Sequence, residues 1–265
     1  MKTIKTILTV ACIIAVTAGV AMAQGKGRGS NGAGQFMAGP GTIVSQLPYE
    51  ELSQQEKDGL LKMREEEKLA RDVYMYLYDL WQNPVFSNIS KSEQRHMDAV
   101  GAILNKYGLE DPVDGMGPGQ FNSPEMQELY SSLTAKGTSS IQDAFLVGAT
   151  IEDLDIKDLE ELMETADNED VLTVYQNLVK GSRNHLRAFG SRLASLGITY
   201  KAQFLTQEEV DAIISSPWER GRVDKDGNPV SGMGKGRNKG HRYGSGAGPN
   251  FVDADGDGIC DNWNK

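Results

Sequence analysis

A glutamate and a histidine stand three residues apart in the stretch "SKSEQRHM", as Glu93 and His96. A carboxylate one helical turn from an imidazole is a pair that binds metal ions inside helical proteins. The chain has only three histidines, so their placement is informative. The same stretch permits a structural interpretation, because Ser90 and Glu93 fit the S-x-x-E capping box of a helix start. On that interpretation Glu93 serves the backbone and His96 is incidental.

A carboxylate also lies on the apolar stripe of a helix predicted at about 53–81. Glu67 occupies a seam position in this stripe, where an apolar residue is expected. Glu66 lies on the adjacent stripe and is the competing candidate. Burying a carboxylate is costly unless it is paired or binds a metal ion. The alternative is that all three glutamates of the run "EEE" are solvated, with some pairing to Lys68 or Arg71.

Three further predicted helices carry carboxylates or imidazoles on their apolar stripes. Each of these side chains also has an ordinary explanation, either a charged flank of the helix or a hydrogen-bonded core histidine. They are Glu93 and His96 in a helix at about 91–107, Glu152 in a helix at about 139–163 with Asp155 one turn beyond it, and His185 in a helix at about 168–196.

Carboxylates and imidazoles on the inner faces of four helices form the ligand set of a dinuclear iron or manganese site. Carboxylates can bridge two cations, while histidines bind each cation terminally. The helices supply the rigidity that fixes the positions of the ligands. A helical bundle whose buried glutamates and histidines pair only with one another remains the alternative.

Helical periodicity from 51 to 216, with almost no strand signal, predicts an all-α fold in one compact domain at 45–216. The long connection at 108–138 contains a short helix at about 124–135 and can carry the chain the full length of a bundle. A last short helix at 207–215 follows a capping box formed by Thr206 and Glu209.

Four blocks of the sequence resemble a ferritin-like family catalogued as domain of unknown function 2202. They are "EEEKLARDVYMYLYDLW", "FSNISKSEQRHMDAV", "VGATIEDLDIKDL" and "VYQNLVKGSRNHLRAF", within about residues 55–195. The resemblance implies a ferritin-like four-helix bundle with a long crossover between the second and third helices. It also implies that the metal ligands are Glu67, Glu93 with His96, Glu152, and His185.

Two other positions are informative in the light of this resemblance. The superfamily often has a tyrosine seven residues after the first glutamate, and Tyr74 stands seven residues after Glu67. The position three residues before His185 is Ser182, where the superfamily has a glutamate. One carboxylate is therefore missing, unless Asp155 takes its place.

The ends of the chain differ from the predicted domain. Residues 1–23 read as a secretory signal peptide that is cleaved after Ala23, which predicts a secreted or periplasmic protein. An uncleaved membrane anchor is the alternative, and no later segment is long and apolar enough to span a bilayer. The mature chain keeps one cysteine, Cys260, so it forms no intramolecular disulfide. Whether Cys260 pairs between chains, and whether the protein is a homo-oligomer, stays open.

Two segments rich in glycine, at 24–44 and at 217–250, predict flexible linkers. The tail at 251–265 contains "DADGDGICD", which has the spacing of a calcium loop. A solvated acidic tail is the alternative. The expected calcium ligands are Asp253, Asp255, Asp257, the carbonyl oxygen of Ile259, and Asp261.

The net charge of −10 argues against a general nucleic-acid binder. The sequence therefore predicts a secreted, ferritin-like metal-binding protein whose partners are metal ions. If the protein is an enzyme, we expect an oxidoreductase that uses iron or manganese with O₂ or peroxide. The alternative is a non-catalytic metal-binding or structural bundle with a calcium-dependent tail.

Overall fold

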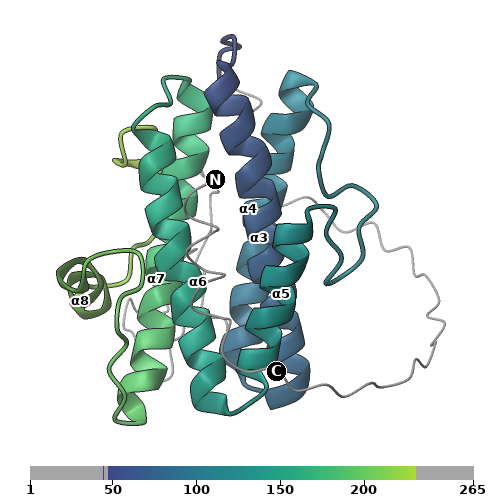
Figure 1. Ribbon diagram of the computed structural model, residues 1–265. Helices are drawn as coiled ribbons and strands as arrows, with labels where there is room; N and C mark the ends of the chain where they lie inside the picture. Colours follow the sequence, from purple (N-terminus) through teal and green to yellow (C-terminus); the bar gives the residue numbers. More distant parts are fainter. Residues whose placement is uncertain (1–43, 45–46, 231–265) are drawn as a thin grey trace, which may run out of the picture.

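The computed structural model describes residue 44 and residues 47–230, and this part of the chain is mostly helical (Figure 1). The all-α fold class that the sequence predicts is confirmed there. The helices are α3 (Gln54–Trp81), α4 (Pro84–Tyr107), α5 (Pro124–Gly137), α6 (Ile141–Met163), α7 (Glu169–Ser195) and α8 (Gln207–Ser215). Two short antiparallel strands follow, β1 (Arg222–Val223) and β2 (Pro229–Val230).

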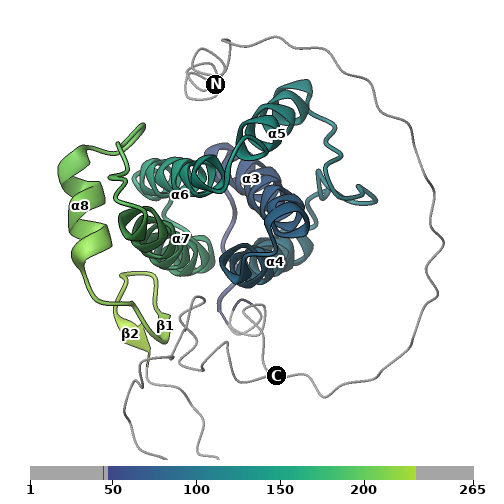
Figure 2. The ribbon, with the colours of Figure 1, turned by 90° about the horizontal axis from the view of Figure 1, so that it is seen from below.

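The four long helices lie side by side around one apolar core. Helix α3 packs against α4, and α6 packs against α7, while α3–α6 and α4–α7 contacts join the two pairs. Figure 2 shows this arrangement end-on, with α5 on the outer side of α3 and α6. The connection from α4 to α6 runs back along the length of the helices and includes α5 (Figure 1). As a result α4 and α6 run in the same direction.

The apolar stripes that predicted the helices make up the core. Each fully buried Leu, Ile, Val, Phe or Met side chain stabilises the fold by about 1.5–3 kcal/mol relative to an exposed one. Gly148 of α6 allows α7 to approach closely, because a Cβ atom there would lie 2.5 Å from the ring of Phe189. Core residues from the predicted stripes include Leu60, Met63, Leu77, Val100, Ile103, Phe145, Ile156, Leu178, Phe189 and Leu193.

Helix α4 begins earlier than the sequence predicts. Its N-cap is Asn83, and Pro84 occupies the first position, where its missing N–H group does no harm. Ser90 lies within the helix, and its hydroxyl group donates a hydrogen bond to the carbonyl oxygen of Ser87. The capping-box interpretation of Glu93 is therefore wrong, because this residue lies in the third turn of α4. In contrast, the predicted capping box at the start of α8 is present.

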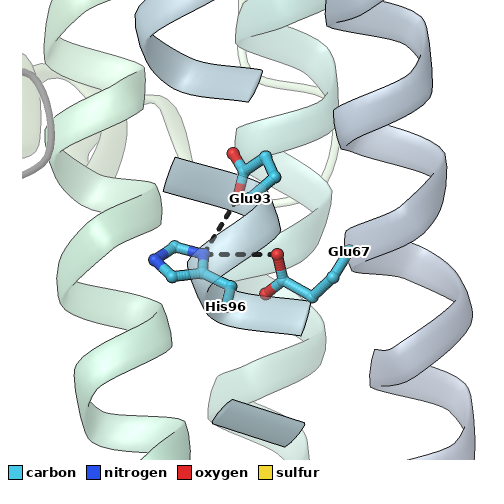
Figure 3. A group of neighbouring side chains, drawn as sticks. All are labelled: Glu67, Glu93 and His96. Carbon is cyan, nitrogen blue, oxygen red and sulfur yellow. Dashed lines mark hydrogen bonds and ion pairs between the residues drawn. The ribbon is translucent and has the colours of Figure 1, made fainter. Parts of the chain in front are cut away.

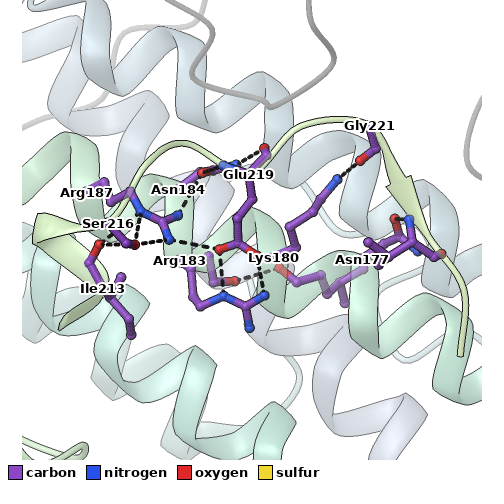
Figure 4. Close-up of polar contacts among 12 residues, drawn as sticks. Asn177, Lys180, Arg183, Asn184, Arg187, Ile213, Ser216, Glu219 and Gly221 are labelled. Carbon is purple, nitrogen blue, oxygen red and sulfur yellow. Dashed lines mark hydrogen bonds and ion pairs between the residues drawn. The ribbon is translucent and has the colours of Figure 1, made fainter. Parts of the chain in front are cut away.

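The first part of the segment 217–250, predicted as a flexible linker, packs on α7 (Figure 4). The carboxylate of Glu219 accepts hydrogen bonds from Arg183 at 2.8 and 2.5 Å and from Arg187 at 2.9 Å. These two arginines lie one turn apart on α7, so a single glutamate reaches both. The composition of the segment predicts flexibility, because composition contains no information about partners on another helix.

Other predicted segments lie outside the described residues. They are the signal peptide at 1–23, the glycine-rich segment apart from Val44, the remainder of the linker from 231, and the calcium-loop tail with Cys260. Among the helices of the described part, none is long and apolar enough to cross a membrane.

Glu56 joins the start of α3 to the start of α7. Its Oε2 atom accepts a hydrogen bond from the backbone N–H of Ser53 at 2.8 Å, within a complete capping box. Its Oε1 atom accepts from the backbone N–H groups of Asn168 at 2.9 Å and Asp167 at 3.2 Å. Burial opposes ionisation, but the N–H donors of Asn168 and Ser53 outweigh it and lower the pKa of Glu56.

Replacing this carboxylate should destabilise the whole fold. We expect Glu56→Gln to lower the free energy of unfolding at pH 7 by about 1–3 kcal/mol, because buried N–H groups lose an acceptor. The folded-state pKa lies below the ordinary value of 4.5. The stabilisation is therefore fully present above pH 4.5 and is lost as the pH falls through the folded-state pKa.

Urea unfolding at pH 7 and at pH 3 measures this effect. A matched control is Glu209→Gln in the exposed capping box of α8, which should change stability by about 0.5 kcal/mol or less. Equal losses for the two variants at pH 7 would contradict the proposed link between the two helix starts.

Candidate metal centre

The first group of possible ligands joins α3 to α4 (Figure 3). The Nδ1 atom of His96 lies 3.2 Å from Oε2 of Glu67 and 2.8 Å from Oε2 of Glu93. Both glutamates are buried, and the ligand atoms of the three residues lie within 4.8 Å of one another. The three side chains therefore surround one point between the two helices.

The second group joins α4 to α6 and α7. The Nδ1 atom of His185 lies 2.8 Å from Oε1 of Glu93 and 3.3 Å from Oε2 of Glu152. All three residues are buried, and their ligand atoms also lie within 4.8 Å of one another. Each of the four long helices thus contributes at least one side chain to the two groups.

Glu93 belongs to both groups and directs a different oxygen to each. Its Oε2 atom faces His96 and its Oε1 atom faces His185. The two imidazole rings are stacked at an interplanar angle of 29°, with their centroids 5.5 Å apart. The structure therefore brings together the five residues that the sequence places on the apolar stripes of four helices.

Unsatisfied buried atoms indicate that the cluster fits a cation. Oε1 of Glu93 and Oε1 of Glu67 are buried and accept no hydrogen bond from the described residues. Oε1 of Glu93 lies 2.8 Å from Nδ1 of His185, within ion-pairing distance. A carboxylate oxygen and an imidazole nitrogen that are buried this close together suit a cation bound by both. Carboxylate oxygen and imidazole nitrogen are ordinary ligands of iron and manganese.

In the absence of a cation, protons carry the balancing charge. Burial raises the pKa of Glu67 to about 8 and that of Glu152 to about 7, although the neighbouring histidines oppose this. Burial also disfavours the charged form of His185, but Glu93 and Glu152 raise its pKa to about 10. Despite burial, His185 and His96 lower the pKa of Glu93. A cation that binds here would displace protons from the cluster.

Tyr74 of α3 supports the second group. Its hydroxyl group donates to Oε1 of Glu152 at 2.5 Å and also lies 3.3 Å from the carbonyl oxygen of Gly148. Tyr74 is fully buried, so its hydrogen bond fixes the carboxylate orientation on α6. The resemblance drew attention to Tyr74 through its spacing from Glu67, but the contact it makes is with another helix.

Asp155 lies beside the centre but outside both ligand groups. Ser182 donates a hydrogen bond to Oδ2 of Asp155 and lies 3.1 Å from the carbonyl oxygen of Leu178. Burial and the carboxylates of Glu67 and Glu152 raise the pKa of Asp155 well above its usual range. Ser182, which stands where the resemblance implies a glutamate, therefore hydrogen-bonds Asp155, the carboxylate that could take the place of that glutamate.

Glu66, the competing candidate on α3, also lies outside both groups. Its Oε1 atom pairs with Lys62 at 3.5 Å, and Lys62 pairs with Asp158 at 2.8 Å. Its Oε2 atom is buried without a hydrogen-bond partner among the described residues. Of the two adjacent glutamates, Glu67 is the one that faces the histidines.

Gly181 of α7 is a functional position that sequence reasoning did not identify. A Cβ atom at this position would lie 2.5 Å from Cε1 and Nε2 of His96. The imidazole ring of α4 therefore lies directly against the backbone of α7. The available signal was a glycine on the same apolar stripe as His185, one turn before it.

The fold and the buried cluster define an all-α protein with a shared carboxylate–histidine centre. The family described as an uncharacterized protein domain, DUF2202, matches residues 56–217, which is more than half of the chain. The chain belongs to the DUF2202 family. The matched residues include all five members of the two ligand groups.

Two comparisons identify a similar archaeal protein. The chain is 53% identical over 178 residues to the uncharacterized protein MJ0754 of Methanocaldococcus jannaschii, covering 67% of this chain and 96% of that protein. The crystal structure of the hypothetical protein MJ0754 from Methanococcus jannaschii DSM 2661 matches with a TM-score of 0.64 at 53% identity. That match covers 65% of this chain and 99% of the crystallised one.

The contact between His96 and α7 can be tested with two glycine substitutions. We expect Gly181→Ala to destabilise the metal-free protein by about 1–3 kcal/mol, because the new methyl group displaces the His96 ring. Gly101→Ala in α4 is the matched control, since its Cβ atom would meet Arg64 only at 3.6 Å. It should stabilise the protein by about 0.4–1 kcal/mol. Urea unfolding of both variants measures the difference, and effects of the same sign would contradict this geometry.

Proposed function

We propose that this chain is a ferritin-like four-helix bundle that binds two iron or manganese ions in its core. The observation that carries the proposal is the position of Glu93 between two histidines. Each of its oxygens faces one imidazole, and each imidazole has a second carboxylate beside it. A carboxylate shared in this way is the arrangement expected of a bridging ligand between two cations.

The residues divide into two sets around this bridge. Glu67 and His96 would hold one cation, Glu152 and His185 the other, and Glu93 both. Tyr74 would orient Glu152. All of these side chains except His96 are buried, which limits their contact with bulk water and strengthens their attraction for a cation. Bound iron or manganese would supply electron transfer to O₂ or peroxide.

The reaction that best suits this ligand set is oxidation of a metal or small-molecule substrate with O₂ or peroxide. A second function, metal binding without turnover, is favoured by one specific observation. Ser182 provides no carboxylate to the second cation, and Asp155 accepts a hydrogen bond from Ser182 and lies outside both ligand groups. Secretion through the segment 1–23 and calcium binding by the tail complete the proposal for the whole chain.

Metal content separates this proposal from a bundle whose glutamates and histidines only pair with one another. We expect about two Mn(II) or Fe(II) ions per chain, because two groups share one bridge. His96→Ala and His185→Ala should each reduce the number by about one, while Glu93→Ala should abolish binding. Elemental analysis after anaerobic loading measures the stoichiometry.

Thermal unfolding supplies an independent measurement. Metal at about 100 times its dissociation constant should stabilise the wild type by about 2.7 kcal/mol, and it should not stabilise Glu93→Ala. Glu160→Gln, an exposed carboxylate on α6, is the control and should behave as the wild type. A melting temperature of the wild type that does not respond to metal would refute the proposed centre.

Turnover separates an oxidoreductase from a storage or structural site. We expect the wild type to oxidise more Fe(II) with O₂ than it binds, and Glu93→Gln to slow this at least about tenfold because the bridge is weakened. Absorbance stopped-flow with excess Fe(II) measures the rate. Stoichiometric binding followed by no oxidation would favour the non-catalytic alternative.

A further inference from the structure

A small apolar cavity, partly open to solvent, lies between α5 and the pair α3–α6. Its volume is about 30 Å³, and all three helices contribute to its lining. Figure 2 shows α5 covering this side of α3 and α6. The apolar part of the lining includes Leu69 of α3, Met126, Leu129 and Leu133 of α5, and Ile151 and Leu154 of α6.

The same cavity borders the candidate metal centre. Glu66 and Asp155 are the acidic members of its lining. Glu66 directly precedes the ligand Glu67 on α3, and Asp155 lies one turn beyond the ligand Glu152 on α6. Asp155 also accepts a hydrogen bond from Ser182, which lies one turn before the ligand His185. The acidic residues of the lining are therefore sequence neighbours of ligands from both groups.

The size and lining of the cavity select its occupant. An apolar cavity of about 150 Å³ accommodates benzene, so a volume of about 30 Å³ suits a molecule of one or two heavy atoms. Water needs two to four polar partners. Polar atoms make up only a small part of the surface that faces the cavity, although Glu66, Thr150 and Asp155 belong to its lining. A diatomic apolar gas fits better than water.

We propose that this cavity binds a diatomic apolar gas and holds dioxygen beside the carboxylates of the metal centre. The inference rests on the proposed function for the identity of the gas, whereas the binding of an apolar gas rests on the cavity alone. Helix α5 belongs to the long connection between α4 and α6. That connection therefore has a role beyond joining two parallel helices, because α5 supplies one wall of the binding site.

Xenon is the probe for the cavity. Crystals of the metal-free protein under xenon pressure should show one xenon atom between α3, α5 and α6. Leu129→Phe, which fills the cavity from α5, should remove it, and Met126→Phe replaces this variant if Leu129→Phe does not fold. Leu109→Phe, the same exchange at a residue that does not line the cavity, should retain xenon. No xenon in the wild type, or an ordered water in its place, would overturn the proposal.

The dependence of Fe(II) oxidation on O₂ tests the identity of the gas. In Leu129→Phe, the KM for O₂ should rise about threefold or more, with kcat at saturating O₂ unchanged. Fe(II) bound per chain should equal that of the wild type and of Leu109→Phe.

An unchanged KM in a variant that excludes xenon would overturn the role in holding dioxygen. Wild-type protein that binds Fe(II) without oxidising it would overturn the same role while leaving the metal centre intact. Wild-type protein that binds no metal would instead refute the metal centre itself.

Discussion

Charge compensation inside the core is the constraint on which the rest of this structure depends. Three glutamates and His185 are buried between four packed helices, with the partly exposed His96 beside them. Unpaired, such groups would each cost several kcal/mol. They are tolerated because each carboxylate has an oxygen within 3.3 Å of an imidazole nitrogen, with which it forms an ion pair. Any change in helix position would separate at least one of these pairs.

The two halves of the centre are not equivalent. The group containing His185 is fully buried and has Tyr74 as an outer hydrogen-bond donor, whereas the side chain of His96 is 12% exposed. The group of Glu67, Glu93 and His96 instead depends on the close approach of His96 to the α7 backbone at Gly181. Ser182 adds to this asymmetry because its hydroxyl group binds Asp155 rather than contributing a carboxylate. Two cations held here would differ in solvent access and in ligand charge.

The sequence alone determined the fold class, the long helices and the side chains that face inward. A period of 3.6 residues makes this possible, since it decides which positions share a helix face wherever the helix lies in space. Glu152 and His185 were identified for that reason. Local capping chemistry was equally readable at Thr206 and Glu209, because every atom of that motif lies within one turn of the chain.

The tertiary structure alone decided which of several equally good local patterns is used. Ser90 and Glu93 satisfy a capping pattern, but α4 starts at Asn83. Glu66 and Glu67 both lie on apolar stripes, and only the position of α4 selects Glu67 as the partner of His96. The sharing of Glu93 between two histidines was likewise invisible in the sequence. The physical reason is that these contacts join helices far apart in the chain, so their distances depend on packing and not on spacing along the sequence.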